Sequence, residues 1–300
     1  MFQNVVVGVD GRSGGRDAVA LATKLTARAG KLTLAHVYPY PGDPPVRGYD
    51  EEEAEQIRRA RPLLEAAAGH GKVDAQLRWI GASSPGCGLR QIAETVDADL
   101  LVVGSTRRGP LGRVLIGDDT RGALDGAPCA VAIAPAGYAY MAPGIRKVGV
   151  GYDGSPDSER ALATGRSLAA QLGAQLAALE VVFFPSRTFG EPIADDAARI
   201  EHLVSRARER VASLGDDLEP YAMAGDAAKK LSVWSASLDL LVVGSRAYGP
   251  IGRLVHGSTS RDLTRHAQCS LLVLPRVAQA RDSVEGFVPA RGSAPLGAQR

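Results

Sequence analysis

The sequence predicts an α/β protein made of two tandem domains, each a doubly wound parallel sheet of five strands. Two observations predict this fold class: an internal repeat, and a regular alternation of short apolar runs with longer helical patterns in each copy. The length of 300 residues agrees with it. A chain of this size suits two domains of about 140 residues better than a single domain.

The repeat is visible by direct alignment. Residues 97–135 align without a gap on residues 237–275, and 16 of these 39 positions are identical. The identities fall on an apolar run, on glycines and on the closing proline. Residues 5–22 align in the same way on residues 148–165. Repeats of this length indicate a duplicated structural unit.

The repeat sets the expected domain organisation. It places one domain over residues 1–140 and a second over residues 141–276, with a junction near 135–147 that is rich in Pro, Gly and Ala. The tail, residues 277–300, is polar, rich in Gly and Pro, and without periodicity. Such a composition predicts disorder.

The elements follow from the pattern of apolar residues. In the first copy we expect strands over 4–9, 31–37, 72–79, 99–104 and 129–134, and helices over 14–29, 50–68, 86–96 and 117–125. In the second copy we expect strands over 147–152, 174–182, 217–222, 239–244 and 270–274, and helices over 156–172, 193–213, 226–237 and 257–266. Runs such as LLVVG are apolar on both faces, as a strand covered by helices on both sides requires. The alternation predicts right-handed crossovers in a parallel sheet.

The composition excludes several classes of protein. The chain has 35 Lys and Arg against 33 Asp and Glu, a net charge of +2 that predicts neither a nucleic-acid partner nor an anionic membrane surface. It has no apolar run of about 18 residues and no signal-peptide pattern, so we expect no membrane span and a cytoplasmic location. Its three cysteines are widely spaced, which predicts neither a disulfide framework nor a metal cluster.

An aspartate closes the first strand of each copy. Asp10 and Asp153 are each followed by glycine and then by a polar turn into a helix. In a doubly wound sheet ligands bind beyond the carboxyl ends of the strands, where such a carboxylate accepts hydrogen bonds from a ribose or an adenine amino group. The alternative is a turn or helix-capping residue. Taken alone, the motif favours this alternative.

A glycine loop follows the fourth strand. In the second copy Gly244-Ser-Arg-Ala247 is followed, after nine residues, by Gly257-Ser258-Thr259. Glycines let a backbone approach a phosphate closely, and the N–H groups that open the next helix favour an anion. The alternative, glycines that only serve tight turns, is equally compatible with the spacing.

These motifs together resemble the universal stress protein family, whose fold belongs to the adenine nucleotide alpha hydrolase-like class. The resemblance rests on the strand-one aspartate, on the loop Gly-x-x-Gly, nine residues, Gly-Ser or Gly-Thr, and on a last strand that ends in proline, and it covers about residues 1–276. It implies ATP as ligand, with Mg²⁺ as its companion. The implied binding residues in the second copy are Asp153, Val181, Val243, Gly244, Arg246, Gly257, Ser258 and Thr259. The weaker set in the first copy is Asp10, Val37, Val103, Gly104 and Gly117.

The sequence departs from the family pattern at three positions. The second glycine of the loop is Arg107 in the first copy and Ala247 in the second. The first copy also has Asp118 after Gly117, where a carboxylate occupies helix N–H groups and repels phosphate. We therefore expect an asymmetric pair, with the second copy as the nucleotide site.

A competing motif is Ser13-Gly14-Gly15-Arg16-Asp17-Ala18, which is similar to the phosphate loop of ATP pyrophosphatases. Its last position is alanine instead of Ser or Thr, and the second copy lacks it. The pyrophosphatase reaction is therefore the least favoured function.

Two functions remain open. The first is an ATP-binding stress-response module with at most weak ATP hydrolysis, because no general base, nucleophile or metal cluster stands out beside the loop. The second is an interaction module that binds no nucleotide. In this family the last strand commonly pairs with its counterpart in another domain. Here the resemblance implies that 129–134 pairs with 270–274 inside one chain, and it leaves a homodimer of the tandem chain open.

Overall fold

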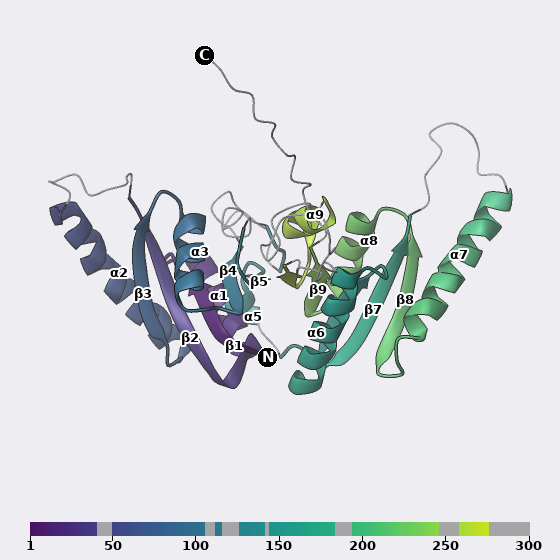
Figure 1. Cartoon of the computed structure of the whole chain (residues 1–300), viewed down its shortest axis with the longest axis horizontal. Coiled ribbons are helices and arrows are strands. Elements are labelled where there is room, and N and C mark those ends of the chain that lie inside the picture. The colour runs from purple at the N-terminus through teal and green to yellow at the C-terminus, as the bar shows by residue number, and fades with distance from the viewer. Residues whose placement is uncertain are drawn as a thin grey trace, which may run out of the picture.

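The computed structural model describes residues 1–40, 50–105, 112–115, 126–141, 144–183, 194–245 and 258–275. Figure 1 shows two similar α/β halves side by side, the first in purple to blue and the second in teal to yellow. The helix expected over 117–125 and the tail 277–300 lie outside the described residues.

Each half alternates strands and helices in the expected order. The first half contains β1 (Phe2–Gly8), α1 (Ser13–Leu25), β2 (Thr26–Pro39), α2 (Asp50–Gly71), β3 (Gln76–Ala82), α3 (Pro85–Thr95), β4 (Leu100–Gly104) and β5 (Ala130–Ala134). A short helix, α5 (Tyr138–Met141), lies in the junction. The second half contains β6 (Lys147–Tyr152), α6 (Pro156–Leu172), β7 (Gln175–Val182), α7 (Ala194–Ala212), β8 (Leu218–Ala224), α8 (Ala227–Trp234), the 3₁₀ helix η1 (Ser235–Ser237), β9 (Leu240–Gly244), α9 (Ser258–His266) and β10 (Ser270–Leu274).

The strand order confirms the predicted fold class. The strands form one sheet in the order β3-β2-β1-β4-β5-β10-β9-β6-β7-β8, and all neighbours within a half are parallel. In the first half, β2 and β3 lie on one side of β1, and β4 and β5 lie on the other side. In the second half, β7 and β8 lie on one side of β6, and β9 and β10 lie on the other side. The strand order therefore reverses between β1 and β4 and between β6 and β9. These are the switch points at which doubly wound folds bind ligands.

The two halves meet at strands β5 and β10. These strands pair antiparallel, with Leu272 opposite Ala132 and Val273 opposite Val131. The pairing leaves β3 and β8 as the outer edges of the ten-stranded sheet, as Figure 1 shows. Pairing the last strands covers two sheet edges that would otherwise present unpaired backbone groups.

A buried apolar layer lies on each face of the sheet and crosses the junction. One layer packs under α1, α2, α6 and α7 and is built around residues such as Leu21, Leu64, Leu168 and Val211. The other packs under α3, α8 and α9, around Leu89, Leu231 and Leu263. Each layer contains residues from both halves, so burial of apolar area stabilises the two halves as one unit.

A repeated aspartate holds the start of the first strand of each half. Asp99 accepts hydrogen bonds from the backbone N–H groups of Gln3 and Asn4, at 2.7 and 2.9 Å. Asp239 does the same for Arg146 and Lys147, at 2.8 and 2.9 Å. Both aspartates directly precede the LLVVG strand, so the repeat preserves a structural contact.

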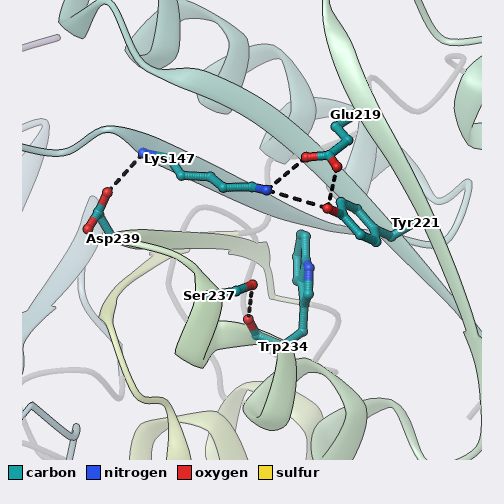
Figure 2. Close-up of polar contacts among 6 residues, drawn as sticks. All are labelled: Lys147, Glu219, Tyr221, Trp234, Ser237 and Asp239. Carbon is teal, nitrogen blue, oxygen red and sulfur yellow. Dashed lines mark hydrogen bonds and ion pairs between the residues drawn. The ribbon is translucent and has the colours of Figure 1, made fainter.

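A polar cluster lies at the amino ends of the strands of the second half (Figure 2). Lys147 Nζ donates to Glu219 at 2.7 Å and to Tyr221 at 3.4 Å. The hydrogen bond to Glu219 raises the pKa of Lys147, and the same bond lowers the pKa of Glu219. The centroids of the Trp234 and Tyr221 rings lie 5.6 Å apart. This cluster holds β6 and β8 together across β7, at the end of the sheet away from the predicted ligand site.

Some predicted boundaries are wrong. The helix expected over 14–29 ends at Leu25, because residues from Thr26 onward begin β2, where Thr26 pairs with Phe2. The third strand begins at Gln76 instead of residue 72, because Lys72 has a positive φ of 50° and the N–H of Val73 donates to the carbonyl of Ala68, so both residues form the turn that closes α2. Helix α5 in the junction has no counterpart among the predicted elements.

The described helices are each too short or too polar to span a lipid bilayer.

Candidate functional site

A cleft lies beyond the carboxyl ends of β6, β7 and β9 in the second half. Its walls come from these strand ends and from the first turns of α6, α8 and α9. Its lining residues are Gly151, Tyr152, Asp153, Ser155, Asp157, Ser158, Leu179, Val181, Ala227, Leu231, Val243, Gly244, Thr259 and Ser260. The cleft therefore brings together Asp153, Val181, Val243, Gly244 and Thr259, five of the eight residues implied for the second copy.

The remaining three implied residues are placed less fully. Ser258 is the first residue of α9 and precedes Thr259 in the cleft wall. Arg246 and Gly257 lie outside the described residues, as does Gly117 of the first copy. Arg107, Asp118 and Ala247, the positions at which the loops depart from the family pattern, also lie outside them.

Asp153 stands at the cleft and also shapes its own turn. Its Oδ1 accepts hydrogen bonds from the backbone N–H of Ser155 at 3.0 Å and from the Ser155 hydroxyl at 2.5 Å. The Ser155 Oγ in turn accepts from the N–H of Ser158 and caps α6. A carboxylate that binds the N–H two residues on forms an Asx turn, so the turn interpretation of this residue is realised. The same carboxylate lines the cleft.

Asp10 forms the matching turn in the first half. Its Oδ1 accepts from the N–H of Arg12 at 2.9 Å, and the Arg12 guanidinium lies 3.9 Å from Oδ2. The other implied residues of this half, Val37, Val103 and Gly104, lie near the carboxyl ends of β2 and β4. The first-half residues thus occupy the equivalent edge of the sheet.

The glycines that end β4 and β9 are required by close packing. A Cβ added to Gly104 would lie 2.0 Å from the carbonyl oxygen of Gly14, and one added to Gly244 would lie 2.7 Å from that of Asp157. Neither glycine adopts a positive φ. The first turn of α1 or α6 thus passes directly against the end of the strand. These two glycines therefore have a steric role in the fold, whatever ligand the cleft takes.

One wall of the cleft is apolar. Leu179 and Val181 of β7, Leu231 of α8 and Val243 of β9 contribute it, and Leu179 and Leu231 belong to the buried layer under α8. A flat aromatic ring such as adenine packs well against aliphatic side chains of this kind. Other lining residues, Asp153, Ser155, Thr259 and Ser260, offer hydrogen-bonding groups.

The first turn of α6 is acidic. It carries Asp157 and Glu159, and Asp157 pairs with Arg160 at 3.0 Å. Glu159 accepts a hydrogen bond from Tyr152, and burial together with this bond raises the pKa of the Tyr152 phenol to about 12. Tyr152 is therefore neutral at physiological pH, and its hydroxyl donates to Glu159.

The Ser13-Gly14-Gly15-Arg16-Asp17 motif forms the first turn of α1. Asp17 is buried, with 1% of its surface exposed, and it accepts hydrogen bonds from the N–H groups of Gly137 and Ala139 at 2.9 and 2.8 Å. Arg160 occupies the matching position in the second half and donates to the carbonyl of Pro275. In both halves this position anchors the chain that leaves the last strand, which is a structural role.

Several residues of the cleft were not among the predicted ones. Ser155 caps α6, Asp157 packs against Gly244, and Ser260 lies in the first turn of α9. The signal for Ser155 was available, because a serine followed by proline at the first helical position predicts a helix start. The contact between Asp157 and Gly244 joins residues far apart in the sequence, and no local pattern indicates it.

The strand order and the cleft at the switch point of the second half define a class of protein. The chain is a tandem doubly wound α/β protein in which ligands are expected beyond the carboxyl ends of the strands. The match to the universal stress protein family covers residues 1–135 and again residues 144–275. The chain belongs to the universal stress protein family, as the sequence predicted.

The relatives agree with the tandem organisation. Universal stress protein Rv2005c of Mycobacterium tuberculosis is 30% identical over 289 residues, which cover 90% of this chain and 96% of that protein. A Thermus aquaticus universal stress protein is 29% identical over 129 residues, 41% of this chain but 93% of the relative. A crystal structure of a universal stress protein from Archaeoglobus fulgidus covers 91% of this chain and 98% of its own, with a TM-score of 0.65 and 17% identity. The last similarity shows the fold.

Proposed function

We propose that the chain binds ATP, as its magnesium complex, in the cleft of its second half, and that binding serves a regulatory role in the stress response. One observation carries this proposal: a single cleft at the switch point joins an aliphatic wall, a carboxylate at the end of β6 and the first turn of α9. These three features suit an adenine, a ribose and a phosphate group in turn. Membership of the family supports the same ligand.

Each part of the cleft has a role in this proposal. Val181 and Val243 pack against adenine, and the Asp153 carboxylate accepts a hydrogen bond from the ribose. The N–H groups that open α9, together with the Thr259 hydroxyl, bind phosphate oxygens. Arg246, Gly257 and Ser258 complete the phosphate side. The weaker first-half set, headed by Asp10 and Gly104, has no such role in the proposal.

The charge of the described wall supports magnesium as the companion of the nucleotide. The Asp157 carboxylate pairs with Arg160, so the repulsion of an uncompensated triphosphate is assigned to the Asp153 carboxylate. Mg²⁺ binds oxygen ligands and is commonly held by one or two carboxylates together with phosphates. The donor set of this wall therefore fits the ion as a partner of ATP.

Binding without strong catalysis is part of the proposal. The titratable side chains of the described cleft wall are Tyr152, Asp153 and Asp157, and Asp157 is engaged with Arg160. The pKa of Tyr152, raised to about 12 by burial and by its hydrogen bond to Glu159, keeps the phenol protonated at neutral pH and makes it a poor general base there. At most weak ATP hydrolysis is expected.

Two measurements on the full chain test the function. Mass spectrometry of the denatured protein after purification should release ATP, and added ATP with Mg²⁺ should raise the melting temperature. Cyclic AMP in a parallel titration shows whether the triphosphate is needed. A chain that carries no nucleotide and shows no thermal shift with ATP would contradict the proposal.

That result would favour the second candidate, an interaction module that binds no nucleotide. The observation favouring it is the pairing of β5 with β10, which makes both halves one sheet without any ligand. We propose that this pairing persists in solution within one chain. Light scattering after size exclusion would show whether two tandem chains also form a homodimer.

A further inference from the structure

Helix α9 joins the proposed nucleotide cleft to the first half of the chain. Its first turn supplies Thr259 and Ser260 to the cleft wall, and the helix is nine residues long and ends at His266. At about 1.5 Å per residue, the helix spans about 13 Å. Because the helix is short, contacts at its far end also influence the placement of Thr259 and Ser260.

The far end of α9 is held by two donors from different halves. The carbonyl of His266 accepts a hydrogen bond from the Ser232 hydroxyl of α8 at 2.7 Å. The carbonyl of Ala267 accepts one from the backbone N–H of Val114 at 2.8 Å. Carbonyls at a helix C-terminus lack partners inside the helix, so each of these donors satisfies a group that would otherwise stay unpaired. The second donor belongs to the first half.

Val114 is itself firmly placed. Its side chain is fully buried, in the same apolar layer as Leu263 and Ala267. The flanking backbone is bonded on both sides: Gly112 N–H donates to Ala136 at 2.8 Å, and Leu115 N–H donates to the Ser105 hydroxyl at 3.3 Å.

The segment that carries Val114 lies between Gly104 and Gly117 in the sequence. It is thus part of the first-half glycine loop, the loop whose sequence departs furthest from the family pattern. A residue of the first-half glycine loop, which is the weaker predicted site, therefore contacts the end of α9. The first turn of α9 lines the cleft of the second half.

We propose that Val114 is a positioning residue for the second-half cleft: its N–H and buried side chain brace the end of α9 and thereby hold the first turn of α9 against the ligand. The proposal rests on the proposed function for its ligand, but the brace itself is a property of the free chain. The first-half loop then serves the second-half site, whether or not it binds a nucleotide of its own.

The brace is tested on the full chain without nucleotide. Val114→Pro removes the donor, and Val114→Ala keeps the donor but shrinks the buried side chain. We expect the amides of residues 263–266 to exchange hydrogen about threefold to tenfold faster in Val114→Pro, and less so in Val114→Ala, while amides of β9 keep their rates. Far-UV circular dichroism shows whether Val114→Pro folds, and Val114→Ala decides the test if it does not.

Two matched variants distinguish the contact between Val114 and the end of α9 from a general loss of structure. Ser232→Ala removes the other donor at the end of α9 and should accelerate the same amides. Ser105→Ala removes the acceptor of the Leu115 N–H, next to Val114 but not on α9, and should accelerate those amides less than Val114→Pro does. The proposal is overturned if the amides of residues 263–266 exchange at the wild-type rate in the folded Val114 variants. It is also overturned if Ser105→Ala accelerates these amides as much as Val114→Pro does.

A nucleotide titration separates this proposal from the proposed function. If ATP binds the wild-type chain, Val114→Pro should weaken binding by about threefold to tenfold, although residue 114 does not line the cleft. Unchanged affinity in that variant overturns the positioning role. If ATP fails to bind the wild-type chain, the proposed function falls, and the exchange measurement still decides whether Val114 places α9.

Discussion

The two halves share one fold but differ in charge where their first helices begin. In the first half α1 follows Arg12, has Arg16 in its first turn, and lacks a side-chain cap. In the second half α6 is capped by Ser155 and carries Asp157 and Glu159 in its first turn. The turns before these helices, at Asp10 and Asp153, are closely similar.

The difference separates what the fold requires from what a ligand requires. Both halves keep a glycine where a helix touches a strand end, and both keep an aspartate before the LLVVG strand. Charges facing the cleft are free to change, because exposed charges contribute little to folding. An acidic first turn already occupies the positive end of α6, so the proposed function assigns the phosphate to the first turn of α9. The ligand is therefore decided by the site and not by the fold.

The largest expected effect concerns the glycines that both halves keep. Gly104→Ala should lower the free energy of unfolding by more than about 3 kcal/mol, and Gly244→Ala by about 1–3 kcal/mol, because the added methyl group meets backbone in both cases and meets it closer at Gly104. Urea denaturation of the full chain measures both. Gly69→Ala is the control: nothing lies near its added methyl group, and this helical glycine should gain up to about 1 kcal/mol. Equal stability of all three variants would contradict the steric role.

The next effect contrasts the anchors of the last strands. Asp17→Ala leaves two N–H groups of the junction without their acceptor and should cost about 2–4 kcal/mol. Arg160→Ala removes a partly exposed donor and should cost about 1 kcal/mol. Thermal unfolding of the two variants compares them, with Asp17→Asn between them because it keeps one acceptor oxygen. A cost for Arg160→Ala as large as that for Asp17→Ala would remove this contrast.

The third effect tests the asymmetry of the nucleotide sites. Asp153→Ala should abolish the ATP-induced thermal shift, since a lost hydrogen bond to a charged group is worth about 1.5–3 kcal/mol, or at least a tenfold loss of affinity. Asp10→Ala removes the matching turn of the first half and should change the shift little. Because both aspartates hold a turn, the melting temperature without ATP must be compared first. A larger loss in Asp10→Ala would reverse the assignment of the two halves.

The sequence was sufficient for the fold because the information was local and repeated. The doubly apolar LLVVG runs and the strand–helix alternation predicted the sheet, and β6, α6 and β10 begin and end at the predicted residues. The aspartates and glycines at strand ends were located by the repeat. Errors arose where distant contacts override local preference, as at Thr26, where pairing with Phe2 ends a helix that the composition favours.

Other features could not be predicted because they depend on contacts between the halves. Nothing near Val114 in the sequence indicates that its N–H bonds to Ala267, and nothing near Asp17 indicates that it binds the junction. The glycine loops were predicted for phosphate binding, whereas Gly104 and Gly244 are explained by sterics alone. A glycine has several physical uses, and the sequence does not distinguish them.

The smallest expected effect is one in which the halves should behave alike. Cys129 and Cys269 precede β5 and β10, and each is 5% exposed. Burial raises the pKa of the Cys129 thiol to about 12 and shifts that of Cys269 in the same direction. Both thiols are therefore protonated in the folded chain where an unfolded chain, with a thiol pKa of about 8.5, loses its proton.

The sign of the pH dependence follows from these raised pKa values. The folded state holds its thiol protons more tightly, so the contribution to stability is complete below about pH 8.5 and falls as the pH rises toward about 12. Denaturation midpoints should decline between pH 8.5 and pH 11, and the decline should be shallower by a similar amount in Cys129→Ala and in Cys269→Ala. Iodoacetamide at pH 8 should modify Cys87, which is partly exposed, before either buried thiol. Rapid modification of Cys269 with Cys129 protected would show that the β5–β10 junction opens on one side, and the two halves would then differ in their cores as well as at the starts of their first helices.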